Sequence, residues 1–166
     1  MIYLLDANTL IEAKNRYYRM AVCPAYWNWI QLSQGAGIVS SIDLVGDELK
    51  RGNDELAEWA KDQGDLFLPV SDDDTQQAFG AVAAYVAAQA AEMKPGAIDE
   101  FLAGADPWLI AKAMALENAV VVTHEQFNPQ IRRKYSIPNV CQHFDVQWID
   151  TFELLSQTGA RFVLAE

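Results

Sequence analysis

The chain has 166 residues, of which 51% are hydrophobic, so it is long enough for one domain with a substantial core. Its formal net charge of -11 argues against a protein that grips nucleic acid by general electrostatic attraction, because such binding normally uses a basic face. No apolar run reaches the ~20 residues that a membrane span needs, and no targeting signal is visible at the N-terminus, which predicts a cytoplasmic protein that makes no membrane contact.

The chain opens on the segment MIYLLDANTLIE, in which an apolar run ends abruptly at an acid. Residues 2–5 predict a buried strand of a parallel sheet, because apolar or aromatic side chains occupy every position. Asp6 follows directly, at the end of the strand where open α/β sheets bind their ligands. A helix is expected next, with Asn8 or Thr9 as its cap and Glu12 completing a capping box, which gives Asn8 an alternative structural role.

Aromatic and basic side chains are concentrated in residues 14–34. Pro24 suits the first turn of a helix that ends near Gly35. The aromatic group can pack helices together, form a face between two copies of the chain, or stack on single-stranded bases, and packing is the commonest of these uses. We expect a homodimer. The group consists of Tyr17, Tyr18, Tyr26, Trp27 and Trp29.

Residues 38–40 predict a second strand, which leads to a helix capped by Ser41. At about 100° per residue, one arc of this helix is apolar. Glu48 falls within that arc, and buried carboxylates are rare unless they are paired or bound to metal. Glu48 is therefore a candidate metal ligand, with an internal salt bridge as the structural alternative. The apolar arc is made of Ile42, Leu44, Val45 and Leu49.

In the middle of the chain a third strand is predicted at residues 66–70, with one helix before it and one after it. Asn53 is expected to cap the helix before that strand. Ser71 is expected to cap a long helix that ends before Pro95. The acids at positions 72–74 then complement the positive end of the helix dipole, and we do not assign them to a metal.

Asp106 stands before a proline, which is typical of a helix start. The helix that begins there is apolar on nearly all sides, so its first turn is buried unless it borders a cleft. A short turn leads from it into a strand at residues 119–122, so helix and strand run antiparallel. This places Asp106 near the end of the strand from which Thr123 and Glu125 emerge.

If the strands at residues 2–5 and 119–122 are parallel neighbours, carboxylates from distant parts of the sequence share one pocket. Like charges at close range raise one another's pKa, and a divalent cation compensates them. An all-oxygen ligand set suits Mg²⁺ or Mn²⁺, and such ions support the chemistry of metal-dependent nucleases. The candidate catalytic and metal-binding residues are Asp6, Glu48, Asp106 and Glu125.

The basic residues mostly follow one of these acids along the chain. They are candidate contacts to a nucleic acid, and the alternative is a set of solvated helix faces. The residues concerned are Lys14, Arg16, Arg19, Lys50, Arg51, Arg132, Arg133 and Lys134.

The C-terminal quarter is predicted to hold a short basic helix at residues 129–135, a strand at 139–144, a helix at 148–156 and a terminal strand at 161–164. His124 and His143 lack the spacing of a metal site, and we interpret them as ordinary polar or core residues. Two cysteines far apart in the sequence indicate neither a disulfide framework nor a zinc site.

Four segments, LLDANTLI, DELKRG, ADPWLIAKA and VVTHE, resemble in this order the motifs of PIN-domain nucleases, and within them a PIN-like subfamily of uncharacterised function. The resemblance covers nearly the whole chain. It implies a single PIN-like domain over residues 1–166, with a three-layer α/β/α fold, a mostly parallel central sheet and flavodoxin-like topology. It also implies a metal-dependent endoribonuclease that uses Mg²⁺ or Mn²⁺ to hydrolyse RNA phosphodiesters, often as the toxin of a toxin-antitoxin pair with a cognate antitoxin protein.

On that resemblance Asp6, Glu48 and Asp106 are metal ligands and Glu125 takes the fourth acidic position. Asn8 and Thr123 are supporting polar residues, and the basic clusters contact the RNA substrate. Family members commonly carry aspartate in the position of Glu125 and a hydroxyl residue in that of Asn8.

The same residues bear on three other functions, of which only the first stays open. A catalytically inactive PIN-like binding or regulatory module would act through protein-protein contacts of the aromatic group. An aspartate-based phosphatase of the haloacid-dehalogenase type is excluded, because it needs a second aspartate where this chain has Asn8. A receiver domain needs an acid pair at the first strand end and a lysine after the last central strand, which disfavours it.

Overall fold

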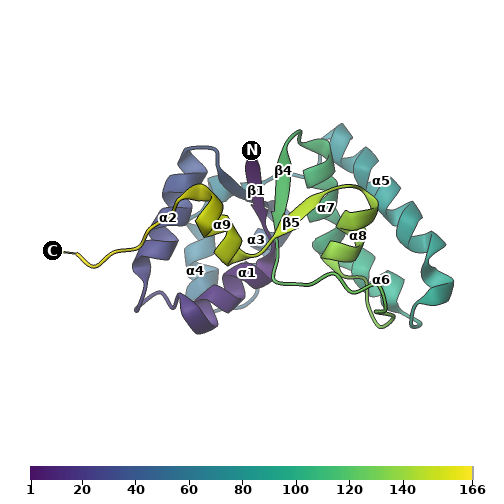
Figure 1. Cartoon of the computed structure of the whole chain (residues 1–166), viewed down its shortest axis with the longest axis horizontal. Helices are drawn as coiled ribbons and strands as arrows, with labels where there is room; N and C mark the ends of the chain where they lie inside the picture. The colour runs from purple at the N-terminus through teal and green to yellow at the C-terminus, as the bar shows by residue number, and fades with distance from the viewer. Residues whose placement is uncertain (166) are drawn as a thin grey trace.

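Five parallel strands form the central sheet of the computed structural model, which describes residues 1–165 (Figure 1). Strand β1 lies in the middle, pairs with β2 on one side and β4 on the other, and has Leu5 opposite Val122. The predicted parallel pairing of residues 2–5 with residues 119–122 is confirmed. The sheet order is β3 (Phe67–Leu68), β2 (Val39–Ile42), β1 (Ile2–Leu5), β4 (Ala119–Val122) and β5 (Gln147–Ile149).

Helices cover both faces of this sheet, and Figure 1 shows one group on each side of it. The first group comprises α1 (Ala7–Glu12), the π-helical turn η1 (Ala13–Tyr17), α2 (Pro24–Gly35), α3 (Asp43–Lys50), α4 (Glu55–Lys61), the 3₁₀ turn η2 (Gly64–Leu66) and α9 (Thr151–Thr158). The second comprises α5 (Asp73–Ala88), the 3₁₀ turn η3 (Ala90–Glu92), α6 (Ala97–Ala103), α7 (Asp106–Ala115) and α8 (Ile137–His143).

The three-layer α/β/α arrangement with a parallel sheet is confirmed. The order of the strands, 3-2-1-4-5, differs from the flavodoxin order 2-1-3-4-5, because the chain moves outward from β1 to β3 and then returns to β1's other side for β4 and β5. The expected flavodoxin-like topology therefore holds for the layers and not for the strand order. None of the helices between residues 1 and 165 is both long and apolar enough to cross a bilayer.

Helix α7 lies between α5 and the sheet and carries the centre of the core on that side. Leu109 and Ile110 are fully buried, and Pro107 occupies the first turn, as its sequence predicted. On the opposite side α3 approaches β3 closely at Gly46, where a Cβ atom would lie 2.9 Å from the ring of Phe67. These two packed helices fix the positions of two acids, one at the start of α7 and one on α3.

The segment after β4 differs from the sequence-based prediction. Residues 129–135 form turns, and residues 139–144 belong mostly to helix α8. Ser136 caps this helix by accepting a hydrogen bond from the Asn139 amide at 3.2 Å, and a proline follows in the first turn. These start signals outweigh the short apolar run that predicted a strand. The strand β5 lies at 147–149, where a helix was expected to begin, and residues 161–164 form no strand.

Several helix boundaries lie one residue from the predicted ones. Asp72 and Asp54, not Ser71 and Asn53, cap α5 and α4, and each accepts a hydrogen bond from the amide three residues on. Helix α6 was not predicted at all, because the preceding proline and glycine masked its short apolar pattern.

Lys112 of α7 ties the start of α5 to the core. Its side chain is 10% exposed, and Nζ donates to the Pro69 carbonyl and to Asp72 Oδ1, both at 2.9 Å. Hydrogen bonds from Lys112 and Thr75 hold the pKa of Asp72 well below its usual range. We expect Lys112→Met to lower the midpoint of thermal unfolding by roughly 2–4 °C at neutral pH.

The effect of Lys112→Met should depend on pH. A lowered pKa in the folded state stabilises the protein above the unfolded value of 3.8, and this contribution is lost as pH falls. The difference between wild type and variant should therefore shrink from about pH 5 downward. Lys61→Met, which breaks the exposed ion pair with Glu58, is the control and should change the midpoint little. A difference that stays constant down to pH 3 would contradict this role for Lys112.

Candidate active site

The parallel pairing of β1 and β4 brings Asp6 and Thr123 together at the carboxyl ends of the strands. The Asp6 amide donates to the Val122 carbonyl at 2.9 Å, and the Thr123 hydroxyl donates to Asp6 Oδ2 at 3.0 Å. The same hydroxyl accepts from the amide of Glu125 at 3.1 Å. Thr123 therefore orients Asp6 and positions the backbone that carries Glu125, which fits its predicted supporting role.

Asp6 also begins helix α1, and its carboxylate is left free of capping. The residue stands at the N-cap position with extended backbone, and its carbonyl accepts from the amide and hydroxyl of Thr9 at 3.1 and 2.7 Å. The predicted cap at Asn8 or Thr9, with its capping box to Glu12, is wrong because α1 starts earlier. Asn8 is instead exposed and lines the acidic cavity described next.

A cavity of about 260 Å³ gathers acids from four parts of the chain. Its acidic lining residues are Glu48 of α3, Glu100 of α6, Asp106 of α7 and Glu125, and Asn8 and Lys134 line it as well. Asp6 is buried and is not part of this lining. The Ala105 amide donates to Glu48 Oε1 at 3.3 Å, which joins α3 to the start of α7. Within residues 1–165 Glu48 makes no ion pair, so the internal salt bridge considered as its alternative role is not formed. We call this space the acidic cavity.

Burial of the acids, reinforced by their mutual repulsion, is the main electrostatic feature of the site. Burial is the largest cause that raises the pKa of Asp6, which is 2% exposed, to about 7. The charges of Glu125 and Glu48 raise this pKa further, and the Thr123 hydroxyl and the nearby Asn8 backbone amide lower it. Burial, followed by the charges of Asp6, Glu125 and Glu48, raises the pKa of Asp106 to about 8, and Lys134 opposes this rise. The site thus holds more negative charge than its own residues neutralise.

Glu125 differs from the other acids because it already has partners. Lys134 Nζ lies 3.1 Å from Oε1, and the Ile137 amide in the first turn of α8 donates to Oε2 at 3.0 Å. Glu125 therefore fastens the start of α8 to the end of β4. The contact between Glu125 and the Ile137 amide could have been found from the helix start signal at Ser136. That signal was overlooked because residues 139–144 were predicted to form a strand.

The donor set fits a divalent cation, although no ligand cage is already assembled. Among the residues that the structure describes, no three acidic, histidine or cysteine side chains converge closely enough to hold an ion. Asp6, Glu48 and Asp106 nevertheless offer carboxylate oxygens and form no ion pair within residues 1–165. All-oxygen sets of this kind suit Mg²⁺ or Mn²⁺ better than zinc.

Only two of the basic candidates lie next to the acids or beside their cavity. Lys134 lines the acidic cavity, and Arg132 lines an adjoining one. Lys14 and Arg16 are held in ion pairs with Asp54 at 2.9 Å and Glu12 at 2.8 Å. The remaining candidates are exposed: Arg19, Lys50, Arg51 and Arg133.

His124 is more constrained than the sequence suggested. Its Nε2 lies 2.6 Å from the Tyr17 hydroxyl and 3.1 Å from that of Thr151. With Phe152 it lines a further cavity of about 440 Å³, which shares Asn8 and Glu125 with the acidic cavity. The predicted packing role of the aromatic group is confirmed at its centre, where Tyr26 is fully buried and stacks on Tyr18 with ring centroids 4.6 Å apart.

The parallel sheet and its two helical layers define a PIN-like domain. The structure is similar to a solved chain described as VapBC2 from Rickettsia felis bound to a DNA fragment from their promoter. The TM-score is 0.53 and the sequence identity 15%, with 90% of this chain and 98% of that chain covered. VapC is a PIN-domain toxin, and at this identity the likeness shows the fold.

By sequence, the chain belongs to the family described as Domain of unknown function (DUF4411), whose model matches residues 3–162. No curated protein matches the chain. The predicted PIN-like domain is confirmed at the level of the fold, and the family to which the chain belongs is one of unknown function.

The raised pKa of Asp106 predicts a gain in stability when its charge is removed. We expect Asp106→Asn to raise the free energy of unfolding by roughly 1–3 kcal/mol at pH 8 in EDTA. The pKa of Asp106 is about 8 in the folded chain, whereas the ordinary value of 3.8 applies to the unfolded chain. The protonated carboxyl group therefore contributes its full stability below pH 3.8, and this contribution is lost as the pH rises toward 8. The gain should therefore be small near pH 4.5.

Urea unfolding at both pH values measures this gain. Asp47→Asn removes an exposed acid from α3, one residue before Glu48, and is the matched control that should change little at either pH. Equal effects of the two substitutions at pH 8 would show that general charge, and not the acidic cavity, is responsible.

Proposed function

We propose that this chain is a metal-dependent endoribonuclease that hydrolyses RNA phosphodiesters with Mg²⁺ or Mn²⁺. The observation that carries the proposal is that Asp6 and Asp106, a hundred positions apart, come close enough for the charge of Asp6 to raise the pKa of Asp106, while neither acid forms an ion pair within residues 1–165. Buried acids with raised pKa values lower the stability of the folded chain, so their presence indicates a functional role such as metal binding or catalysis.

Each side chain then has a distinct part. Asp6, Glu48 and Asp106 would hold the ion, which when bound lowers the pKa of a water and stabilises charge that develops on a phosphate. Thr123 keeps Asp6 in one orientation through its hydroxyl. Lys134 supplies a positive charge at the wall of the acidic cavity, and Asn8 offers an uncharged polar group there. A phosphodiester in this cavity would meet both the acids and a lysine.

The similarity in fold to VapC extends the proposal to partners. VapBC2 is a complex of two proteins, and VapC is a toxin. We propose that this chain likewise acts as a toxin with a cognate antitoxin protein, in the cytoplasm and as a homodimer.

Cleavage of labelled single-stranded RNA with Mn²⁺ tests the catalytic proposal. Asp6→Asn and Asp106→Asn should each slow cleavage by roughly 10²-fold or more, the scale on which charge-stabilising groups act, and EDTA should abolish it. Asp47→Asn should cleave like wild type. Because Asp106→Asn is expected to be more stable than wild type, unfolding does not explain its loss. Cleavage that survives both EDTA and the Asp6→Asn substitution would refute the proposal.

Calorimetric titration with Mn²⁺ separates the enzyme from an inactive PIN-like binding module. The wild-type chain should bind Mn²⁺ with release of protons above pH 7, because the ion displaces protons shared by Asp6 and Asp106. The Asp6→Asn, Asp106→Asn double variant should not bind. A wild-type chain that shows no binding would favour the inactive module.

A further inference from the structure

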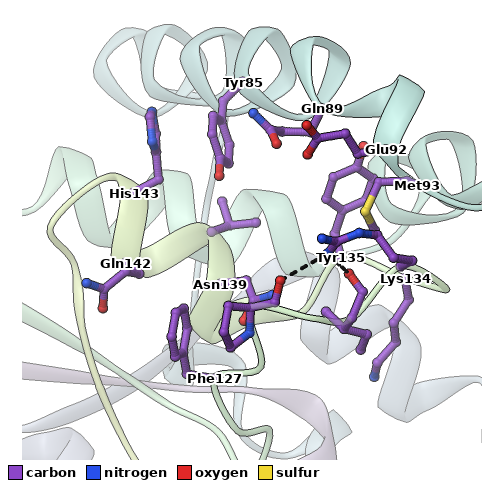
Figure 2. A pocket seen from close by; sticks show the side chains of 14 residues that line it. Tyr85, Gln89, Glu92, Met93, Phe127, Lys134, Tyr135, Asn139, Gln142 and His143 are labelled. Atoms are coloured by element: carbon purple, nitrogen blue, oxygen red, sulfur yellow. Dashed lines mark hydrogen bonds between the residues drawn. The ribbon is translucent and has the colours of Figure 1, made fainter.

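A second cavity adjoins the acidic one. It has a volume of about 340 Å³, within the range of about 300–1,000 Å³ that small-ligand pockets occupy. The end of α5, the turn η3, residues 127–135 and α8 enclose it (Figure 2). Lys134 and Tyr135 line both cavities, so a chain-like ligand in the acidic cavity can continue into this one.

Aromatic rings form two of its walls. Tyr85 of α5 stacks on His143 of α8, with ring centroids 3.7 Å apart and planes 13° from parallel. Phe127 is 46% exposed and lies across the cavity from Gln89 and Glu92 in Figure 2. A phenylalanine exposed to this extent at a cavity wall offers a ring face on which a nucleobase can stack.

The polar groups of the cavity suit an anionic ligand with a hydrogen-bonding edge. Arg132 Nη1 donates to the carbonyls of Pro129 and Ile131, both at 3.0 Å, and its own carbonyl accepts from the Lys94 amide. These bonds hold the guanidinium in place and leave its other nitrogen atoms for a phosphate. The half-buried side chain of Gln89 has no hydrogen bond within residues 1–165, so its amide can meet the edge of a base.

We propose that this cavity is a nucleotide subsite, which holds one residue of single-stranded RNA beside the phosphate that lies in the acidic cavity. The base stacks on Phe127, Gln89 contacts its edge, and Arg132 binds its phosphate. The inference rests on the proposed ribonuclease function, and it adds the site at which one nucleotide of the substrate binds. Arg132 and Lys134 outnumber Glu92 at this cavity, which favours an anionic ligand. The exposed ring of Phe127 favours a nucleotide over an acidic protein segment, because a base can stack on it.

Binding is measured apart from cleavage with the Asp6→Asn chain, which is not expected to cut RNA. A fluorescent single-stranded RNA of about ten nucleotides is titrated and followed by anisotropy. Phe127→Ala and Arg132→Ala, each added to that chain, should weaken binding by roughly fivefold to a hundredfold. Arg132→Ala should also reduce the slope of log affinity against log salt by about 1.

The controls take neighbouring residues of the same type. Arg133→Ala removes the exposed arginine next in sequence to Arg132. Gln89→Ala, added to the same chain, should also weaken binding, and its control is Gln77→Ala, which removes an exposed glutamine of α5. Neither control residue lines the cavity, and both should bind RNA like the parent chain. Equal losses in Arg132→Ala and Arg133→Ala would show that general charge attracts the RNA and would overturn the subsite.

The two proposals fail in different ways. If the wild-type chain does not cleave RNA, yet the Phe127→Ala and Arg132→Ala chains still bind it more weakly than their parent, the subsite stands and the nuclease proposal falls. If wild type cleaves RNA, and Phe127→Ala and Arg132→Ala neither weaken binding nor slow cleavage, the nuclease proposal stands and the subsite is refuted. An absence of RNA binding by the parent chain refutes the subsite as well.

Discussion

The parallel pairing of β1 with β4 is the constraint on which the candidate site depends. With Leu5 opposite Val122, the next residues on the two strands, Asp6 and Thr123, meet within hydrogen-bond distance. A shift of one residue in this register would turn every side chain of one strand to the opposite face. Helices cover both faces of the sheet, so such a shift would not expose these apolar side chains but would mispack them against the wrong layer. The packing of the core thereby fixes the position of the acids.

Helix α7 completes the site because its direction opposes that of the strands. It packs against the sheet along its length and so delivers Asp106 to the edge where the strands end. The burial that stabilises this helix is also the largest cause of the raised pKa of Asp106. The same packing therefore stabilises the helical layer and disfavours the charged form of Asp106. Folded proteins commonly keep reactive groups in unfavourable states in this way.

The sequence was sufficient for those features whose signals are local or periodic. Residues 2–5 and 119–122 are apolar throughout, Asp106 precedes a proline, and Glu48 falls on an apolar helical arc, so each acid was placed correctly on its element. The caps of α4 and α5 were missed by one residue, because neighbouring positions such as Ser71 and Asp72 carry equally good capping side chains and only the tertiary contact from Lys112 distinguishes them. The predicted cap at Ser41 was also wrong, because its hydroxyl donates to the Leu5 carbonyl and Ile42 stands at the N-cap of α3.

Features that depend on contacts across the fold were not predictable. The apolar run in residues 139–144 fits a strand or a buried helix equally well, and burial of Val140 and Cys141 against the core decides for the helix. Because this helix was predicted as a strand, the hydrogen bond from its first amide to Glu125 could not be predicted either. The pairing of Glu125 with Lys134, and the second cavity that shares Lys134 and Tyr135 with the acidic cavity, were consequently not predictable from the sequence.

The division of charge between the two cavities reconciles an acidic chain with the RNA substrate that we propose. Long-range attraction scales with net charge and is screened beyond about 8 Å at physiological salt, so a charge of -11 opposes the approach of RNA but does not govern contacts inside a cavity. Lys134 stands at the boundary, paired with Glu125 at 3.1 Å on the acidic side and lining the second cavity on the other. A phosphate that reaches this boundary competes with Glu125 for the same ammonium group. Release of Glu125 from that pair would add negative charge to the acidic cavity at the moment the substrate arrives, and so strengthen the site's demand for a divalent cation.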